Sequence, residues 1–271
     1  MDNVNKTLYI PLYGKALVSR LGLLLADPMA EKIWNSAGIS LKGKAASKWL
    51  AYTMGMRSAV FDNWLREKLE PGALVLHLGC GLDSRCCRVS CENSWFDVDF
   101  PAVIEERRKH FSESETCRMI GSDLRENWLE NIPAGGTAIV VMEGVSMYLT
   151  AEERLNLLKA IGAHFDRVHL LLDAYTVFAA KATKYKNPIN DVGVTTVYGF
   201  DDPREPEQGT GFAFVREHDM TPEAMIATLP KSEQGFFRLF FAGKTGKKFY
   251  RMYEYENNKG ENSCATTMTN A

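Results

Sequence analysis

Apolar residues recur with two different periods along this chain. Between 45 and 69 they return at helical spacing, and Pro71-Gly72 ends the pattern, which predicts a helix. After residue 72 the apolar positions instead form short runs bounded by polar segments, as expected of buried strands. These runs lie at 73–78, 94–98, 117–120, 137–142 and 168–172.

Helical segments are expected between the predicted strands. Pro101 stands where a helix over 102–111 would begin, because proline is favoured in the first helical turn. Thr150 and Glu153 form a capping box at the start of another helix. Strands that alternate with helices indicate βαβ units, and therefore an α/β fold with a mostly parallel sheet covered on both faces.

The pattern changes after residue 210. Two later strands are expected at 211–217 and 248–255, and they would form an antiparallel edge of the sheet. Two helices are expected between these strands, at 221–228 and 232–242.

Composition and charge narrow the class of protein. The 271 residues are 45% hydrophobic and 24% charged, which is ordinary for a globular protein with a large core. A net charge of -2 gives no electrostatic reason to expect nucleic acid or an anionic membrane as partner. Apolar runs reach only five or six residues, whereas a membrane-spanning helix needs about 20. With no signal peptide visible, we expect a cytoplasmic protein.

The cysteines do not predict a metal site or disulfides. Cys80, Cys86, Cys87 and Cys91 are close in sequence but do not form the two regularly spaced ligand pairs of a zinc site. We therefore expect reduced thiols and no bound metal.

Candidate chemistry lies at the ends of the predicted strands, because ligands of open α/β sheets bind beyond the carboxyl ends of the strands. The first strand is followed by Gly79-Cys80-Gly81, where glycines permit a tight turn and close approach of the backbone. Asp99 ends the second strand, 18 residues after Gly81, a spacing that suits a carboxylate on ribose hydroxyls. Asp123 and Glu143 follow the third and fourth strands.

These residues favour one kind of ligand over another. A dinucleotide site would have a third glycine where this chain has Ser84. Several carboxylates close together would also be unfavourable for a negatively charged pyrophosphate. A ligand with an adenosine and a cationic centre but no phosphate fits better. S-adenosylmethionine is such a ligand.

Longer motifs resemble a known family. The segments LHLGCGLDSR, WFDVDFP, GSDLREN and MEGVSMYLTAEE occur in the order and spacing of the leucine carboxyl methyltransferase family, and TLYIPLYGKALVSR and RSAVFD resemble its upstream elements. The resemblance runs from about Thr7 to about Ile161. It implies a class I, Rossmann-like fold and S-adenosylmethionine as cofactor. The family includes bacterial enzymes of polyketide O-methylation.

The resemblance also implies roles for single residues. Gly79 and Gly81 would line the methionine and ribose portion of the cofactor. Asp99 would hold the ribose hydroxyls, and Asp123 would accept a hydrogen bond from the adenine amine beside the Leu124 backbone.

A second group would serve the amino-acid end of the cofactor and the acceptor. Glu143 would lie near the amino-acid end, and Arg57 would pair with its carboxylate with help from Lys15. Apart from the resemblance, Tyr148 is a candidate wall of the acceptor pocket because it lies just past the fourth strand, and His218 is a further candidate for contact with substrate because it follows a later strand.

Other polar and aromatic residues are expected to be structural. Asp83 and Arg85 would form an ion pair in the loop or a helix cap, Asp97 would be an accessory polar group beside Asp99, and His77 would be packed in its strand. The four phenylalanines between 236 and 241 are expected in the core or in a dimer contact.

The expected function is methyl transfer to a carboxylate or to a phenolic or other hydroxyl oxygen, with a small polyketide-like molecule as the favoured acceptor. A carboxylate is already ionised at pH 7, whereas a phenol with a pKa near 10 gains from a base, and no residue of the pattern decides between them. Two alternatives remain open: an NAD(P)-dependent oxidoreductase, and a non-catalytic S-adenosylmethionine-binding protein. The oligomeric state is not predicted.

The expected organisation is one methyltransferase domain over 1–256. Within it, 1–69 would form a helical N-terminal cover and 176–210 an insertion on the substrate side. Residues 257–271 are polar and would form a tail.

Overall fold

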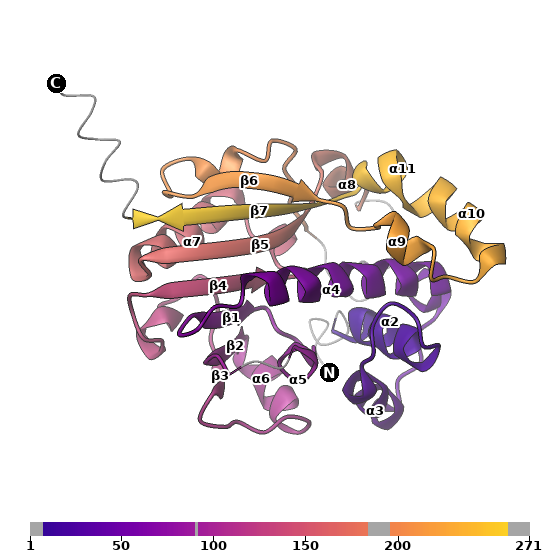
Figure 1. The fold of residues 1–271 in the computed structure, drawn as a ribbon, viewed down its shortest axis with the longest axis horizontal. Helices are drawn as coiled ribbons and strands as arrows, with labels where there is room; N and C mark the ends of the chain where they lie inside the picture. The colour runs from indigo at the N-terminus through magenta and orange to yellow at the C-terminus, as the bar shows by residue number, and fades with distance from the viewer. Residues whose placement is uncertain (1–7, 90–91, 184–195, 260–271) are drawn as a thin grey trace.

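A mixed sheet runs through the protein, whose computed structural model describes residues 8–89, 92–183 and 196–259 (Figure 1). Seven strands of the described residues form it in the order β3-β2-β1-β4-β5-β7-β6. They are β1 (Leu74–Leu78), β2 (Trp95–Asp99), β3 (Cys117–Gly121), β4 (Thr137–Met142), β5 (Arg167–Tyr175), β6 (Ala213–His218) and β7 (Tyr250–Asn258).

Strand directions confirm the predicted mostly parallel sheet with an antiparallel edge. Strands β3, β2, β1, β4 and β5 pair in parallel, whereas β7 pairs antiparallel with both β5 and β6. The main difference from prediction is the length of β5, which continues past residue 172 because Asp173, Ala174 and Tyr175 pair with the start of β7. This extension carries two polar side chains to the carboxyl edge of the sheet.

Helices cover both faces of the sheet. The helix predicted over 45–69 is α4 (Lys48–Lys68), and its Phe61 and Trp64 pack on Ile139 and Val141 of β4. Helix α7 (Ala151–His164) covers the opposite face, begins with the predicted Thr150 capping box, and packs on Val140. Successive residues of β4 thus point to opposite faces and are buried on both, as expected of a central parallel strand.

The remaining elements are shorter or lie at the ends of the sheet. Two helices precede α4 in the described part of the N-terminal segment. The helix predicted at 221–228 is a single turn, the helix predicted at 232–242 is present over Lys231–Phe241, and a further short helix follows it. The remaining elements are α2 (Tyr9–Arg20), α3 (Pro28–Ala37), α5 (Arg85–Arg88), α6 (Pro101–Arg108), α8 (Val177–Ala182), α9 (Glu223–Ile226), α10 (Lys231–Phe241), α11 (Gly243–Lys247), η1 (Gly43–Ala46), η2 (Trp128–Asn131), η3 (Ser146–Tyr148) and η5 (Glu205–Glu207).

Several of these helices gather at the edge where the parallel strands end. In Figure 1, α2, α8, α10 and α11 lie around that end of the sheet. Val18 of α2, Tyr52 of α4 and Phe237 of α10 share one buried apolar cluster, which ties the C-terminal helices to the N-terminal ones. No helix in the described ranges is long and apolar enough to cross a membrane.

Candidate functional site

A cavity of about 790 Å³ opens at the carboxyl edge of the sheet, between the strand ends and the surrounding helices. Nine of the ten residues predicted for the site line it. They are Lys15, Arg57, Gly79, Gly81, Asp99, Asp123, Leu124, Glu143 and Tyr148.

The turn after β1 forms the floor of the cavity. Gly79 and Gly81 have φ angles of +65° and +52°, in the left-handed region that favours glycine. A Cβ atom at Gly79 would also collide with the side chain of Val145. Glycine is therefore required at Gly79 both by the backbone conformation and by the packing of Val145, and both glycines line the cavity.

Asp99 lies at the end of β2, beside this turn. Its Oδ2 accepts the backbone N–H of Gly81 at 2.8 Å, and its Oδ1 accepts that of Phe100 at 2.7 Å. Burial raises the pKa of Asp99, although both backbone donors oppose the rise. A carboxylate has about four acceptor positions, so Asp99 keeps two for a ligand in the cavity, as a pair of ribose hydroxyls requires.

Asp123 and Leu124 lie at the end of β3, on the rim of the cavity. The guanidinium of Arg125 donates from Nε to both carboxylate oxygens of Asp123, at 2.9 and 3.0 Å. This hydrogen bonding lowers the pKa of Asp123 and fixes its orientation. With the backbone N–H and Nη2 of Arg125 also donating to it, the ionised carboxylate has its acceptor positions occupied by Arg125, which a ligand amine would have to displace.

Glu143 directly follows β4 and lies at the centre of a buried charged cluster. Its carboxylate accepts from Arg57 Nε at 3.0 Å, from Ser58 Oγ at 2.9 Å, and from Arg85. Burial raises the pKa of Glu143, but Arg57 and Arg85 outweigh it and bring the value to about 2. Glu143 is thus a permanent negative charge in the cavity wall.

Arg57 is more heavily engaged than the sequence suggested. Its Nε and Nη2 face Glu143, while Nη1 donates to Asp173 at 3.2 Å and to Tyr250 at 2.9 Å. Lys15 contacts one carboxylate among the described residues, Asp83 at 3.2 Å. An ammonium has three N–H donors, so Lys15 has more capacity than Arg57 for a ligand carboxylate.

The charges of the cluster suit a cationic ligand. Four cationic side chains and five carboxylates are linked by ion pairs, an excess of one negative charge. These side chains are Lys15, Arg57, Arg85 and Arg88, with Asp27, Asp62, Asp83, Glu143 and Asp173. S-adenosylmethionine has a sulfonium, an ammonium and one carboxylate, so its net positive charge offsets this excess.

The residues expected to be structural are buried, and two of them, Asp83 and His77, also line the cavity. Asp83 and Arg85 lie 3.4 Å apart. Asp97 does not line the cavity but accepts from Arg107 Nη2 at 2.6 Å. His77 contacts the Asp97 carboxylate at 3.3 Å within the sheet.

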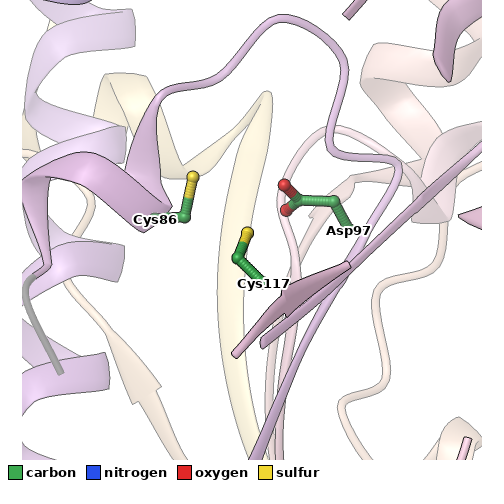
Figure 2. Close-up of side chains that lie close together, drawn as sticks. All are labelled: Cys86, Asp97 and Cys117. Carbon is green, nitrogen blue, oxygen red and sulfur yellow. The ribbon is translucent and has the colours of Figure 1, made fainter. Parts of the chain in front are cut away.

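Two thiols and a carboxylate, those of Cys86, Cys117 and Asp97, lie close together, as Figure 2 shows. The ligand atoms of Cys86, Asp97 and Cys117 lie within 4.8 Å of one another, and no other such group occurs in the part of the chain that the structure describes. Arg107 donates from Nε and Nη2 to Asp97 and lies 3.7 Å from Cys86 Sγ through Nη2. A guanidinium therefore already supplies the positive charge at this place, which disfavours a metal ion. Cys91 lies outside the described residues.

His218 is the one predicted residue that does not line the cavity. It ends β6, the outermost strand, and its Nε2 lies 2.7 Å from Glu254 Oε2. Lys68 of α4 contacts the same carboxylate group. His218 thus belongs to an ion-pair cluster on the α4 face of the sheet.

The structure adds cavity residues that the sequence did not single out. Phe240 and Phe241 line the cavity, whereas Phe237 lies in the core as predicted and Phe236 packs against Trp49. Further cavity residues of this kind include Tyr175, Met220, Phe249 and Tyr250. Four phenylalanines within six helical residues give no signal of which ones face a ligand.

Comparisons with known proteins agree with this geometry. The family model described as leucine carboxyl methyltransferase matches residues 8–162. The chain is 30% identical over 234 residues to "Tetracenomycin polyketide synthesis O-methyltransferase TcmP" of Streptomyces glaucescens, covering 84% of this chain and 87% of that protein. It is 30% identical over 183 residues to "S-adenosyl-L-methionine-dependent methyltransferase dpfgK" of Gibberella zeae, covering 60% and 61% of the two chains.

Solved structures share the fold at low sequence identity. Magnesium protoporphyrin IX methyltransferase of Synechocystis, solved with bound SAH, superposes with a TM-score of 0.51 at 14% identity. The match covers 85% of this chain and 94% of that chain. The sheet described above is therefore the sheet of a class I methyltransferase.

Proposed function

Since this chain belongs to the leucine carboxyl methyltransferase family and is an S-adenosylmethionine-dependent methyltransferase, we propose that it methylates an oxygen atom of a small, largely apolar acceptor. The Streptomyces relative, an O-methyltransferase by its name, supports oxygen as the acceptor atom. The observation that carries the proposal is the shape and lining of the cavity. A single space joins the charged cluster to an aromatic wall.

The described residues provide the groups that S-adenosylmethionine needs. We assign the ribose hydroxyls to Asp99 beside the open backbone of Gly79 and Gly81, and the adenine to Asp123 and Leu124. The amino-acid end faces the charged cluster around Glu143, where Lys15 is the better partner for its carboxylate and Arg57 positions Glu143. When bound, the cofactor supplies a methyl group on a sulfonium, which is a strong electrophile.

The rest of the cavity suits an acceptor with fused or aromatic rings. Met147, Tyr148, Phe240 and Phe249 line it together with α8, which begins the 176–210 insertion. Residues 184–195 of that insertion lie outside the described residues. A cavity of this size holds both a cofactor and a drug-sized molecule, and its apolar walls exclude water from the methyl group and the acceptor oxygen.

Two experiments test the proposal in sequence. Calorimetric titration with S-adenosylhomocysteine should give saturable binding, and NAD and NADP should give none. Methyl transfer from radiolabelled S-adenosylmethionine is then measured with 2-naphthol and 2-naphthoic acid, which place a hydroxyl and a carboxyl on the same ring position. Label found on oxygen in either product supports the proposal. Binding without transfer to any small oxygen acceptor would contradict it.

A further inference from the structure

We propose that Cys86 and Cys117 form a modification site, in which a peroxide converts the two thiols to a disulfide and the disulfide weakens binding of the cofactor. Neither residue lines the cavity, so neither takes part in methyl transfer. The modification is independent of the proposed acceptor. Its effect on affinity rests on the assignment of the glycine turn to S-adenosylmethionine.

The two thiols come from segments that are distant in the sequence. Cys86 lies on α5, shortly after the glycine turn, and Cys117 begins β3. Figure 2 shows both sulfur atoms near Asp97, and the ligand atoms of all three residues lie within 4.8 Å of one another. An S–S bond is about 2.0 Å long, so the sulfur atoms need to approach by less than about 3 Å. Both residues are half-buried, and a small oxidant can therefore reach them.

Cys87 is closer to Cys86 in the sequence but is the poorer partner. The two sulfur atoms lie 3.9 Å apart. However, the Cα atoms of adjacent residues are about 3.8 Å apart, whereas a disulfide usually joins Cα atoms about 4.4–6.8 Å apart. The geometry therefore assigns Cys117 as the partner of Cys86 and leaves Cys87 as a control in the same cluster.

Cys86 is the thiol that reacts first with the oxidant. Hydrogen bonds from the thiols of Cys117 and Cys87 lower the pKa of Cys86 well below its ordinary value, although burial and the charge of Asp97 oppose this. Arg107 Nη2 lies 3.7 Å from the same sulfur, and its positive charge also favours the thiolate. The same hydrogen bonds raise the pKa of Cys117, which therefore keeps its proton until the second step.

The fourth cysteine in the described ranges does not compete. Cys80 lines the cavity, but it is fully buried, and this burial raises the pKa of its thiol. A protonated, buried thiol reacts slowly with peroxide, because the thiolate is the nucleophile.

The oxidation balances with one molecule of hydrogen peroxide. The Cys86 thiolate attacks a peroxide oxygen, so that an S–O bond forms, the O–O bond breaks, and hydroxide leaves and takes a proton from solvent. The Cys117 sulfur then attacks the sulfenic acid of Cys86. An S–S bond forms, the S–O bond breaks, and the oxygen leaves as water with the Cys117 proton. Each sulfur loses one electron, and each peroxide oxygen gains one.

Arg107 connects this site to the glycine turn. Its side chain is fully buried, and its Nη1 donates to the backbone carbonyls of Gly81 at 3.0 Å and Asp83 at 2.6 Å. A disulfide carries no charge, and its formation draws the Cys86 sulfur toward β3. Arg107 then loses its contact with a thiolate, and we expect the guanidinium and the turn bound to it to shift together. The oxidised protein should therefore bind the cofactor less tightly.

The test treats the purified protein with hydrogen peroxide and maps its peptides without reduction. A Cys86–Cys117 disulfide should form within single chains. The dissociation constant of S-adenosylhomocysteine, measured by calorimetry, should rise about tenfold, which corresponds to about one hydrogen bond to a charged group. Dithiothreitol should remove the disulfide and restore the affinity. This reversal excludes methionine sulfoxide as the cause, because dithiothreitol does not repair that product under the same conditions.

Two serine variants serve as matched controls. Before oxidation, both should bind S-adenosylhomocysteine as the wild type does. Cys87→Ser should still form the disulfide and show the tenfold loss of affinity. Cys117→Ser should form no disulfide, and its Cys86 sulfenic acid should be trapped by dimedone.

Three results would overturn the inference. The first is the absence of any disulfide after peroxide treatment, and the second is a disulfide from Cys86 to a cysteine other than Cys117. The third is a Cys86–Cys117 disulfide with unchanged affinity for S-adenosylhomocysteine, which would refute the connection through Arg107. No acceptor is present in these measurements, so failure of the proposed O-methyl transfer would not change their outcome.

Discussion

Replacement of Asp99 by alanine tests the assignment of the ribose site. One acceptor position of the carboxylate is occupied by the Gly81 N–H and one by the Phe100 N–H, and two remain for the cofactor. A hydrogen bond to a charged group contributes about 1.5–3 kcal/mol, so loss of two such bonds should cost about 3–6 kcal/mol. At about 1.4 kcal/mol for each factor of ten, the dissociation constant of S-adenosylhomocysteine should rise at least 100-fold.

The same substitution also removes a support of the glycine turn, and the assay must separate the two effects. Asp166→Ala is the matched control, because Asp166 Oδ2 accepts the N–H of Gly136 at 2.8 Å beyond the opposite edge of the sheet. Both variants should melt at lower temperature in calorimetry, but only Asp99→Ala should lose affinity for S-adenosylhomocysteine. If Asp99→Ala binds as tightly as the wild type, Asp99 supports the turn alone and the ribose assignment is refuted.

Three further substitutions test other parts of the site. Gly79→Ala should lower the free energy of unfolding by about 1–3 kcal/mol, because a residue with a left-handed backbone acquires a Cβ that collides with Val145. An unchanged midpoint of chemical denaturation would contradict this prediction. Phe240→Ala should raise the KM for 2-naphthol about fivefold, a loss of about 1 kcal/mol of apolar contact, and equal weakening of S-adenosylhomocysteine would place Phe240 in the cofactor site instead. His218→Ala should lower the melting temperature, because it removes the contact with Glu254, and should leave kcat and KM unchanged. If kcat falls while the melting temperature stays constant, His218 contacts the acceptor after all.

Most of the residues that we assign to the cofactor could be predicted from the sequence, because they follow from local patterns. Each central strand can be recognised in the sequence as an apolar run, and the residues just after such runs meet at one edge of a parallel sheet. Gly79, Asp99, Asp123 and Glu143 were found in this way, and all four line the cavity. Lys15 and Arg57 lie outside any strand, so only the resemblance to a family indicated them.

The acceptor half depends on contacts between distant segments and was largely missed. The apolar run of β5 ends at residue 172, and only its pairing with β7, some eighty residues later, extends the strand to Asp173 and Tyr175. Which phenylalanine of α10 faces the cavity depends on how that helix docks on α4, which the helical period does not specify. The rule for strand ends selected His218 correctly as a strand-terminal residue, but β6 is the outermost strand and its last side chain faces Glu254.

Much of the aromatic lining of the cavity comes from a later stretch of the chain than the strand-end residues, and this has a consequence for how related enzymes can differ. The family model ends at residue 162, whereas Met220, Phe240, Phe249 and Tyr250 all follow it. Changes between β6 and β7 can therefore reshape the acceptor wall while the cofactor wall stays constant. A chimera that exchanges only this stretch between two relatives would be expected to exchange their acceptor preference, with the hydrogen bonds around Asp99 and Glu143 left intact.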